Sequence, residues 1–229
     1  MREIKALLRA PLEYRYGTLF MSLLLLLSAP ALLPERLDLL GTSIVFTLVV
    51  SAGVGAIAQT QRTFLTALLI AAPALLLFWI GPSLGTRVPE VLGDILLAAF
   101  LAYAAAAILN RVLQADHVDA ETIYGAVCVY FLFAAFWAVI FALVETLAPG
   151  SFNLPESVNL VGGSRFDSGP MFYYSFVTIT TLGYGDITPA TELTRLLALL
   201  EAVLGQLYLV ILIARLVGLY TTRGASGTE

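Results

Sequence analysis

The residues best suited to chemistry form one uninterrupted run, Thr178-Ile-Thr-Thr-Leu-Gly-Tyr-Gly-Asp186. Its two glycines, Gly183 and Gly185, can adopt positive φ, which an alternating backbone needs if successive carbonyl groups are to point at one axis. The hydroxyl of Thr181 adds a further oxygen at one end of this row. Stacked oxygens of this kind suit a dehydrated cation. A glycine-rich turn between two helices is the alternative if Gly-Tyr-Gly is considered alone.

The complete run resembles the selectivity-filter signature of potassium channels at every position except Leu182, where valine is commonest. In these channels rings of backbone carbonyls from four identical loops replace the hydration shell of the ion, and the Thr-Val-Gly-Tyr-Gly loop is the established example. The resemblance implies a filter at 181–185. It also implies selectivity for potassium over sodium, because unselective relatives often carry an acidic residue in place of Tyr184. The K⁺ ligands that it implies are Thr181, Leu182, Gly183 and Tyr184, and Gly185 completes the loop.

The resemblance also implies residues that support the filter, which are Tyr173, Tyr174, Thr178, Thr180 and Asp186. Tyr173 and Tyr174 lie where the family often has a pair of aromatic side chains that brace the loop. We expect Asp186, just outside the filter, to accept a hydrogen bond from Tyr173. The alternative is that both tyrosines belong to the aromatic belt at the membrane interface.

The elements that position this run are membrane helices. Hydrophobic residues make up 59% of the chain and charged residues only 12%, about half the charged fraction of an ordinary soluble domain. The apolar residues gather in blocks long enough to cross a bilayer core about 30 Å thick. A shorter piece, Met171–Thr181, cannot span it. The six long segments are Tyr16–Leu33, Leu39–Ala58, Thr63–Ile80, Val91–Leu113, Thr122–Ala148 and Glu192–Tyr220.

The predicted fold is therefore an all-α membrane protein with six transmembrane helices, a re-entrant pore helix and a selectivity filter. Residues 1–114 form a four-helix module, and residues 115–229 form the pore domain. The resemblance to potassium channels covers the pore domain by its motifs and the module only by its helix count. The pore domain comprises an outer helix at about 122–148, a pore helix at about 170–180, the filter at 181–185 and an inner helix at about 192–220.

The positive charges orient these helices. With a cytoplasmic amino terminus, eight of the 12 arginine and lysine residues fall on the cytoplasmic side, which is the side that they favour. We therefore expect a multi-pass protein of the cell membrane with both termini in the cytoplasm. The inside residues are Arg2, Lys5, Arg9, Arg15, Arg62, Arg111, Arg215 and Arg223, and the outside residues are Arg36, Arg87, Arg165 and Arg195.

The fourth segment decides whether the four-helix module can sense voltage. A sensor needs several arginines at every third position, because one charge contributes only about 2.3 kcal/mol per 100 mV. The stretch from Asp94 to Arg111 contains a single arginine, at its cytoplasmic end. The module is therefore predicted to be a packing or regulatory unit rather than a sensor. His117, in the linker that follows, is either a reporter of cytoplasmic pH or a solvated side chain.

The last segment carries the residues expected to line and gate the pore. Gly205 lies nineteen residues after Asp186, as the glycine hinge of the inner helix does in the family, and tight packing is an equal alternative. An ionisable group within an apolar helix suggests a function. Glu201 either pairs with a hydroxyl of the pore helix, such as that of Thr178 or Thr180, or is protonated. The residues that the register places toward the pore are Gln206, Leu209, Ile213 and Val217.

The predicted function is passive potassium conduction by a homotetramer in membrane lipids, because one chain supplies one filter loop and four are needed. The alternatives are a potassium transporter component, a class that carries four weaker loops in one chain, and a weakly selective cation channel. An enzyme is not expected, since the single histidine lies in a loop and offers no catalytic arrangement at membrane depth. The net charge of −4 gives no basic face for nucleic acid. No small-molecule substrate is predicted, and no cofactor other than K⁺ in the filter.

Overall fold

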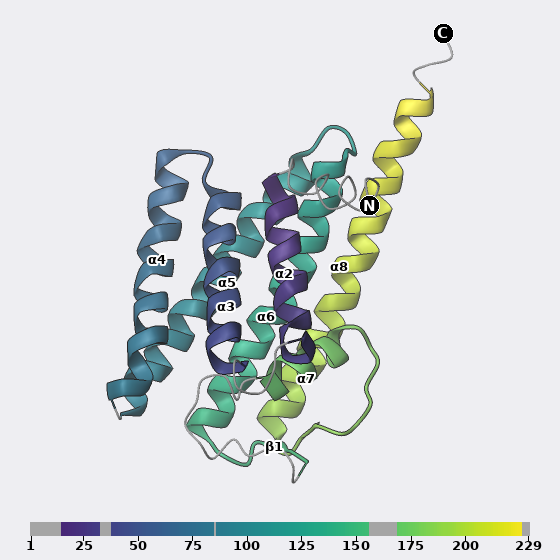
Figure 1. Ribbon diagram of the computed structural model, residues 1–229. Coiled ribbons are helices and arrows are strands. Elements are labelled where there is room, and N and C mark those ends of the chain that lie inside the picture. The colour runs from purple at the N-terminus through teal and green to yellow at the C-terminus, as the bar shows by residue number, and fades with distance from the viewer. Residues whose placement is uncertain (1–14, 33–37, 85, 156–168, 226–229) are drawn as a thin grey trace.

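The computed structural model describes residues 15–32, 38–84, 86–155 and 169–225. Helices account for nearly all of this part of the chain (Figure 1). Each apolar segment predicted from the sequence corresponds to a helix whose bounds agree within a few residues. The long helices are α2 (Arg15–Leu32), α3 (Asp38–Ile57), α4 (Gln61–Ile80), α5 (Arg87–Gln114), α6 (Ala120–Leu147) and α8 (Glu192–Ala225). The short elements are η2 (Gly81–Leu84), β1 (Phe152–Asn153), α7 (Gly169–Ile179) and β2 (Thr188–Pro189).

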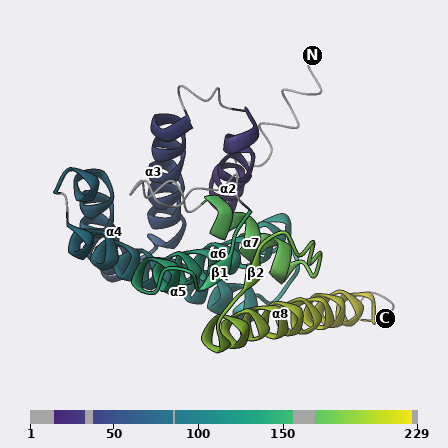
Figure 2. The ribbon, with the colours of Figure 1, turned by 90° about the horizontal axis from the view of Figure 1, so that it is seen from below.

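The long helices lie side by side, and α7 is set among the ends of α2, α6 and α8 (Figure 1). When the molecule is turned, α2 and α3 are seen on one side of α5 and α6, and α8 follows α6 along an edge of the molecule (Figure 2). The linker 115–119 joins α5 to α6 as antiparallel neighbours. The short pore-helix candidate α7 is therefore held between the two helices that flank it in the sequence.

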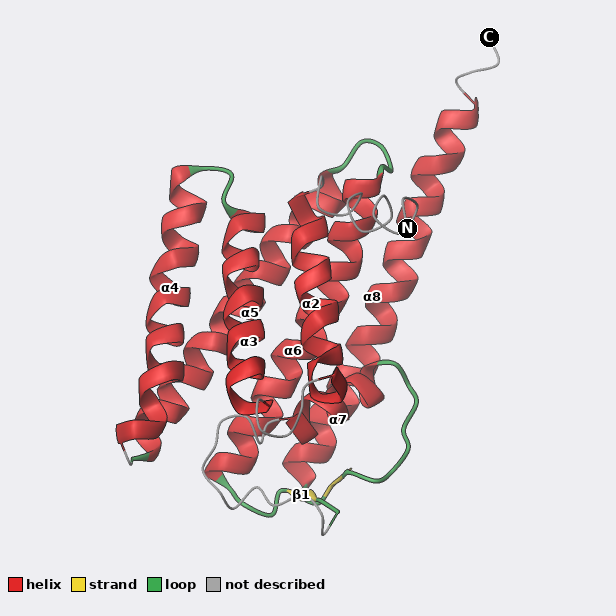
Figure 3. Cartoon of the chain, viewed as in Figure 1, coloured by secondary structure: helices red, strands yellow, loops and turns green. Residues whose placement is uncertain are grey.

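Four of the described helices, α4, α5, α6 and α8, are long and apolar enough to cross a membrane. The apolar stretches described within α2 and α3 are shorter, at Arg15–Ser28 and Ser43–Ile57. Strand occurs in the described residues only as the pair β1–β2 (Figure 3). The helices thus indicate an all-α, multi-pass membrane protein, as predicted. Six crossings, a re-entrant pore helix and the orientation of the termini stay predictions.

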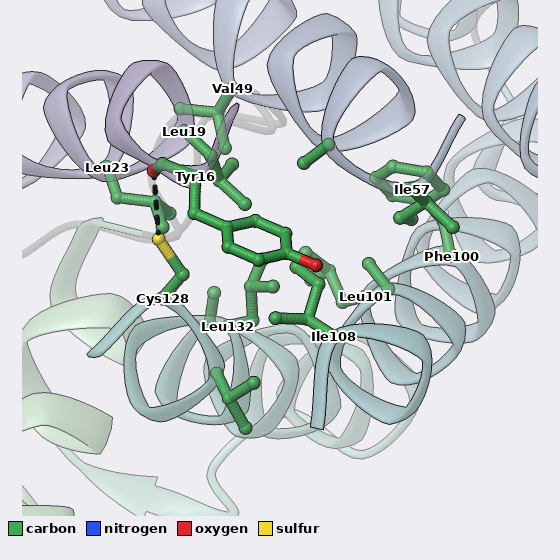
Figure 4. Close-up of a cluster of buried hydrophobic side chains, with 14 of the residues drawn as sticks. Tyr16, Leu19, Leu23, Val49, Ile57, Phe100, Leu101, Ile108, Cys128 and Leu132 are labelled. Atoms are coloured by element: carbon green, nitrogen blue, oxygen red, sulfur yellow. Dashed lines mark hydrogen bonds between the residues drawn. The ribbon is translucent and has the colours of Figure 1, made fainter. Parts of the chain in front are cut away.

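The largest buried cluster joins helices α2 to α6 and reaches α8 at Leu212, and Figure 4 shows part of it. The ring of Tyr16, near the start of α2, points into the middle of this cluster and lies close to Leu101, Ile108 and Leu132. The thiol of Cys128 on α6 donates to the carbonyl of Tyr16 at 3.5 Å and is fully buried. One core therefore crosses the boundary between residues 1–114 and 115–229.

The close approach of α2 to α6 depends on a glycine. A Cβ built on Gly125 of α6 would lie 2.9 Å from Cδ2 of Tyr16 and 3.1 Å from Cγ2 of Val112. The backbone N–H of Tyr16 also donates to Oε1 of Glu121 at 3.2 Å, so α6 satisfies one of the unpaired amides at the start of α2. The absence of a side chain at this position lets the tyrosine ring and α5 both reach the surface of α6.

Replacing Gly125 by alanine should destabilise the protein. Overpacking costs about 1–3 kcal/mol, which outweighs the gain of about 1 kcal/mol that alanine has over glycine within a helix. The matched control is Gly55→Ala on α3, because a Cβ at that helical glycine meets no described atom within 4 Å. Thermal unfolding of the purified protein should show a lower midpoint for Gly125→Ala and an equal or higher one for Gly55→Ala. Equal midpoints for the two variants would contradict the close approach.

Candidate functional site

The loop between α7 and α8 has an alternating backbone. Positive φ occurs at Thr181 (62°), Gly183 (56°) and Gly185 (79°), which are every second residue of the predicted filter. In an ordinary extended chain successive carbonyl groups point to opposite sides, whereas this alternation turns them toward one side. The sequence anticipates the two glycines. It does not anticipate Thr181, because positive φ is rare in a β-branched residue.

The amides of this loop are bonded back to the end of α7. The N–H groups of Leu182 and Gly183 both donate to the carbonyl of Val177, at 3.0 and 3.3 Å, and the N–H of Thr181 donates to the carbonyl of Thr178 at 3.0 Å. The carbonyl oxygens of residues 181–184 accept no hydrogen bond from another described residue. The loop lies exposed on the single chain. Its arrangement therefore offers a row of uncommitted backbone oxygens on an exposed side.

The carboxyl end of α7 is fixed by α6 and α8. The carbonyl of Ile179 accepts hydrogen bonds from the Tyr130 hydroxyl at 3.0 Å and from Nε2 of Gln206 at 3.3 Å. A Cβ built on Gly205 would lie only 2.5 Å from Cγ1 of Ile179. Because α8 continues as one helix through this point, the structure favours the packing interpretation of Gly205. Tyr130 carries no sequence signal of this role.

The two tyrosines of α7 differ in their surroundings. Tyr173 is exposed, and the Asp186 side chain raises the pKa of its hydroxyl. Tyr174 is buried, with its ring centroid 5.2 Å from those of both Phe141 and Phe152. The expected bond between Tyr173 and Asp186 stays a prediction, while Tyr174 belongs to an aromatic cluster rather than to an interfacial belt.

The buried acid of α8 has a partner that the sequence analysis did not name. As expected, Glu201 pairs with a pore-helix hydroxyl, but its Oε1 is hydrogen-bonded to Ser175 rather than to the examples Thr178 and Thr180. The hydroxyl of Thr180 instead donates to the carbonyl of Phe176 within α7, at 2.5 Å. The difference follows from helix register, because α7 and α8 run in the same direction here.

Two contacts between α7 and α8 lie four residues apart along both helices. Ile179 of α7 contacts Gly205 of α8, and residues four positions earlier, Ser175 and Glu201, contact each other one turn away. Knowledge of the first contact would have predicted the second.

The outer side of the loop is tied to the end of α6. The carboxylate of Glu145 accepts the N–H groups of Gly150 at 2.7 Å and Phe152 at 3.0 Å, which fixes the turn that follows α6. Strand β1 then pairs antiparallel with β2, just beyond the filter. The carbonyl of Ser151 accepts from the Thr194 hydroxyl at the start of α8, at 3.0 Å. None of these contacts was predicted.

The inner part of α8 leaves apolar side chains uncovered on the single chain. Of the residues expected to face a pore, Gln206 is exposed, Leu209 is half-buried, and Ile213 and Val217 are 58% and 56% exposed. Further exposed side chains lie at other angles around the helix. They are Leu193, Leu196, Leu199, Leu200, Val203, Leu204, Leu207, Val210 and Ile211. Surfaces of this extent are covered by lipid or by other protein.

The linker between α5 and α6 contacts the inner end of α8. Nη2 of Arg215 donates to the carbonyl of Ala115 at 3.3 Å. In the same linker Asp119 caps α6 by accepting from the N–H and hydroxyl of Thr122, and these bonds lower the pKa of the Asp119 carboxyl. Nε2 of His117 lies 3.6 Å from Oδ2 of Asp119, with both side chains largely exposed.

Residues 125–222 match a family model described as an ion channel. Over this segment the chain is similar to ion channels. The matched segment takes in most of α6, all of α7, the filter loop and α8 almost to its end. An ion-channel family is not an enzyme family, in line with the expectation from the sequence. No curated protein matches the chain.

A double-mutant cycle can distinguish whether Gly205 packs against Ile179 or acts as a hinge. Gly205→Ala should lower the thermal stability of the purified protein by overpacking, and Ile179→Ala should lower it by leaving a cavity. Because the second change makes room for the first, the double variant should be more stable than additivity predicts, by about 0.5–3 kcal/mol. Additive effects, with altered opening in Gly205→Ala alone, would instead favour the hinge.

Proposed function

We propose that this chain is one subunit of a potassium-selective channel that conducts K⁺ passively through a homotetrameric pore. The observation that carries the proposal is the exposed loop 181–185, with positive φ at every second residue and carbonyl oxygens left uncommitted by the described residues. A K⁺ ion enters a filter only where protein oxygens replace its hydration shell at similar distance. The ligands in this proposal are Thr181, Leu182, Gly183 and Tyr184.

Four copies follow from what one loop can offer. A single loop presents one carbonyl at each level of the filter, so a full ring of oxygens needs identical loops around a common axis. The exposed apolar side chains of α8 support the same assembly, because inner helices from neighbouring copies and lipid would cover them. Gln206, Leu209, Ile213 and Val217 then line the path below the filter.

The first four helices do not act as a voltage sensor in this proposal. The middle of α5, residues 95–110, contains no charged side chain, and the single arginine of its last turn is Arg111. A charge at the helix end crosses little of the membrane potential. We place both termini in the cytoplasm of a cell-membrane protein with six crossings.

Ion flux into proteoliposomes tests the proposal. The reconstituted protein should pass K⁺ with little Na⁺, and Ba²⁺ should block the flux. Equal K⁺ and Na⁺ fluxes would contradict the potassium selectivity and favour a weakly selective cation channel. Potassium movement that requires the gradient of a second ion would favour a transporter component.

Gly183→Ala should abolish this flux. A Cβ at a φ of 56° strains the backbone by about 1–2 kcal/mol in every subunit, at a loop whose carbonyls must stay aligned. The matched control is Gly169→Ala at the start of α7, where a Cβ meets no described atom within 4 Å. Crosslinking of both variants checks that they assemble as the parent does. Unchanged K⁺ flux in Gly183→Ala would count against the filter.

Tyr173→Phe should shorten the time for which the channel conducts. The substitution removes only the hydroxyl that bonds Asp186, so the outer end of the loop loses one restraint while the ring remains. Single-channel recordings in planar bilayers should show faster loss of conduction than the parent. The control is Tyr103→Phe on α5, which should leave the recordings unchanged. Identical kinetics for Tyr173→Phe and the parent would remove the bond from the mechanism.

A further inference from the structure

A carboxyl group lies buried at the meeting point of three helices. Glu201 of α8 has no exposed surface, and Ser175 of α7, to which it is hydrogen-bonded, has none either. The hydroxyl of Ser175 also donates to the carbonyl of Ala134 on α6, at 2.7 Å. The chain from Glu201 through Ser175 to Ala134 therefore links the inner helix, the pore helix and the outer helix.

The two hydrogen bonds of Ser175 depend on which of its partners supplies a proton. A serine hydroxyl carries one proton and two lone pairs, whereas a backbone carbonyl can only accept. If the Ser175 proton goes to the carbonyl of Ala134, the second bond of Ser175 must be one that it accepts. Its donor can only be Glu201, and a carboxyl donates only when it is protonated. Both bonds of Ser175 are thus satisfied together when Glu201 is a neutral acid.

The surroundings of Glu201 agree with a neutral form. Oε2 is buried and has no hydrogen-bond partner among the described residues, which is far less unfavourable for a neutral carboxyl than for a charged one. The described residues place no arginine, lysine or histidine within ion-pair distance of it. The titratable side chains that face Glu201 are Tyr130 on α6 and Tyr174 on α7, and both are uncharged at neutral pH. No cationic side chain in the described ranges would therefore compensate an ionised carboxylate at Glu201.

We propose that Glu201 is held as a neutral carboxylic acid and is a positioning residue for conduction. By donating to Ser175, it keeps α7 in register with α6 and α8, and Ser175 lies one turn before the residue whose carbonyl Tyr130 and Gln206 bind. At alkaline pH the carboxyl gives its proton to water, loses its ability to donate and leaves a charge between the helices. Conduction then falls as the pore helix shifts. This role rests on the proposed channel function.

Infrared difference spectroscopy tests the protonation without any need for conduction. Purified parent protein at neutral pH should show the carbonyl stretch of a protonated, hydrogen-bonded carboxylic acid, and Glu201→Gln should lose it. The matched control is Glu192→Gln, at the exposed start of α8, which should keep the band. Ser175→Ala should shift the band, because the acid loses its acceptor. A parent spectrum without this band, or one unchanged in Glu201→Gln, would overturn the proposal.

Flux measured across alkaline pH tests the positioning role. Above the pH at which half of the parent flux is lost, the flux should fall about tenfold or more per pH unit, because each of the four subunits can lose one proton. Glu201→Gln should conduct with no such fall, since an amide donates to Ser175 and cannot ionise. Tyr130→Phe and Tyr174→Phe should retain the fall. An alkaline fall that persists in Glu201→Gln would overturn the role. An infrared band with no K⁺ flux at any pH would refute the channel and leave the protonation standing.

Discussion

The end of the short helix α7 is the point on which the proposed filter depends. A helix leaves its last carbonyls without helical partners, and here the loop itself and two neighbouring helices supply those partners. Val177 accepts the amides of Leu182 and Gly183, while Ile179 accepts from Tyr130 and Gln206. Because the loop uses its N–H groups in this way, its own carbonyls remain for an ion. The same hydrogen bonds thus end α7 and leave the loop carbonyls free to bind an ion.

Contacts at the inner end of α7 and at the outer end of the loop hold this arrangement. At the inner end Ile179 fills the space left by Gly205, and one turn away Ser175 meets Glu201. At the outer end Glu145 fixes the turn after α6, and β1–β2 ties that turn to the start of α8. The loop therefore lies between two fixed points, the end of α7 and the β1–β2 pair, and contacts outside the loop help to hold its geometry.

Local patterns predict the elements of this fold well and their contacts poorly. Runs of apolar residues and their proline, glycine and polar ends gave each helix within a few residues, because these signals act within one turn or one span. The nine-residue motif located the loop for the same reason. Glu201 does pair with a pore-helix hydroxyl, but that hydroxyl belongs to Ser175 rather than to the examples Thr178 and Thr180. That pairing depends on the axial register of two helices, which periodicity within either helix does not contain.

Two of the first four helices, α2 and α5, share a buried core with α6. Tyr16 packs into the notch at Gly125 beside Val112, so α2 and α5 share the core of α6. Arg215 further joins the inner end of α8 to the carbonyl that ends α5. The helices α2 and α5 are therefore in direct contact with α6, and the residue that follows α5 is bonded to α8. Although the middle of α5, residues 95–110, carries no charge, α5 can influence α7 through these contacts, because packed interfaces shift between discrete arrangements rather than deforming continuously.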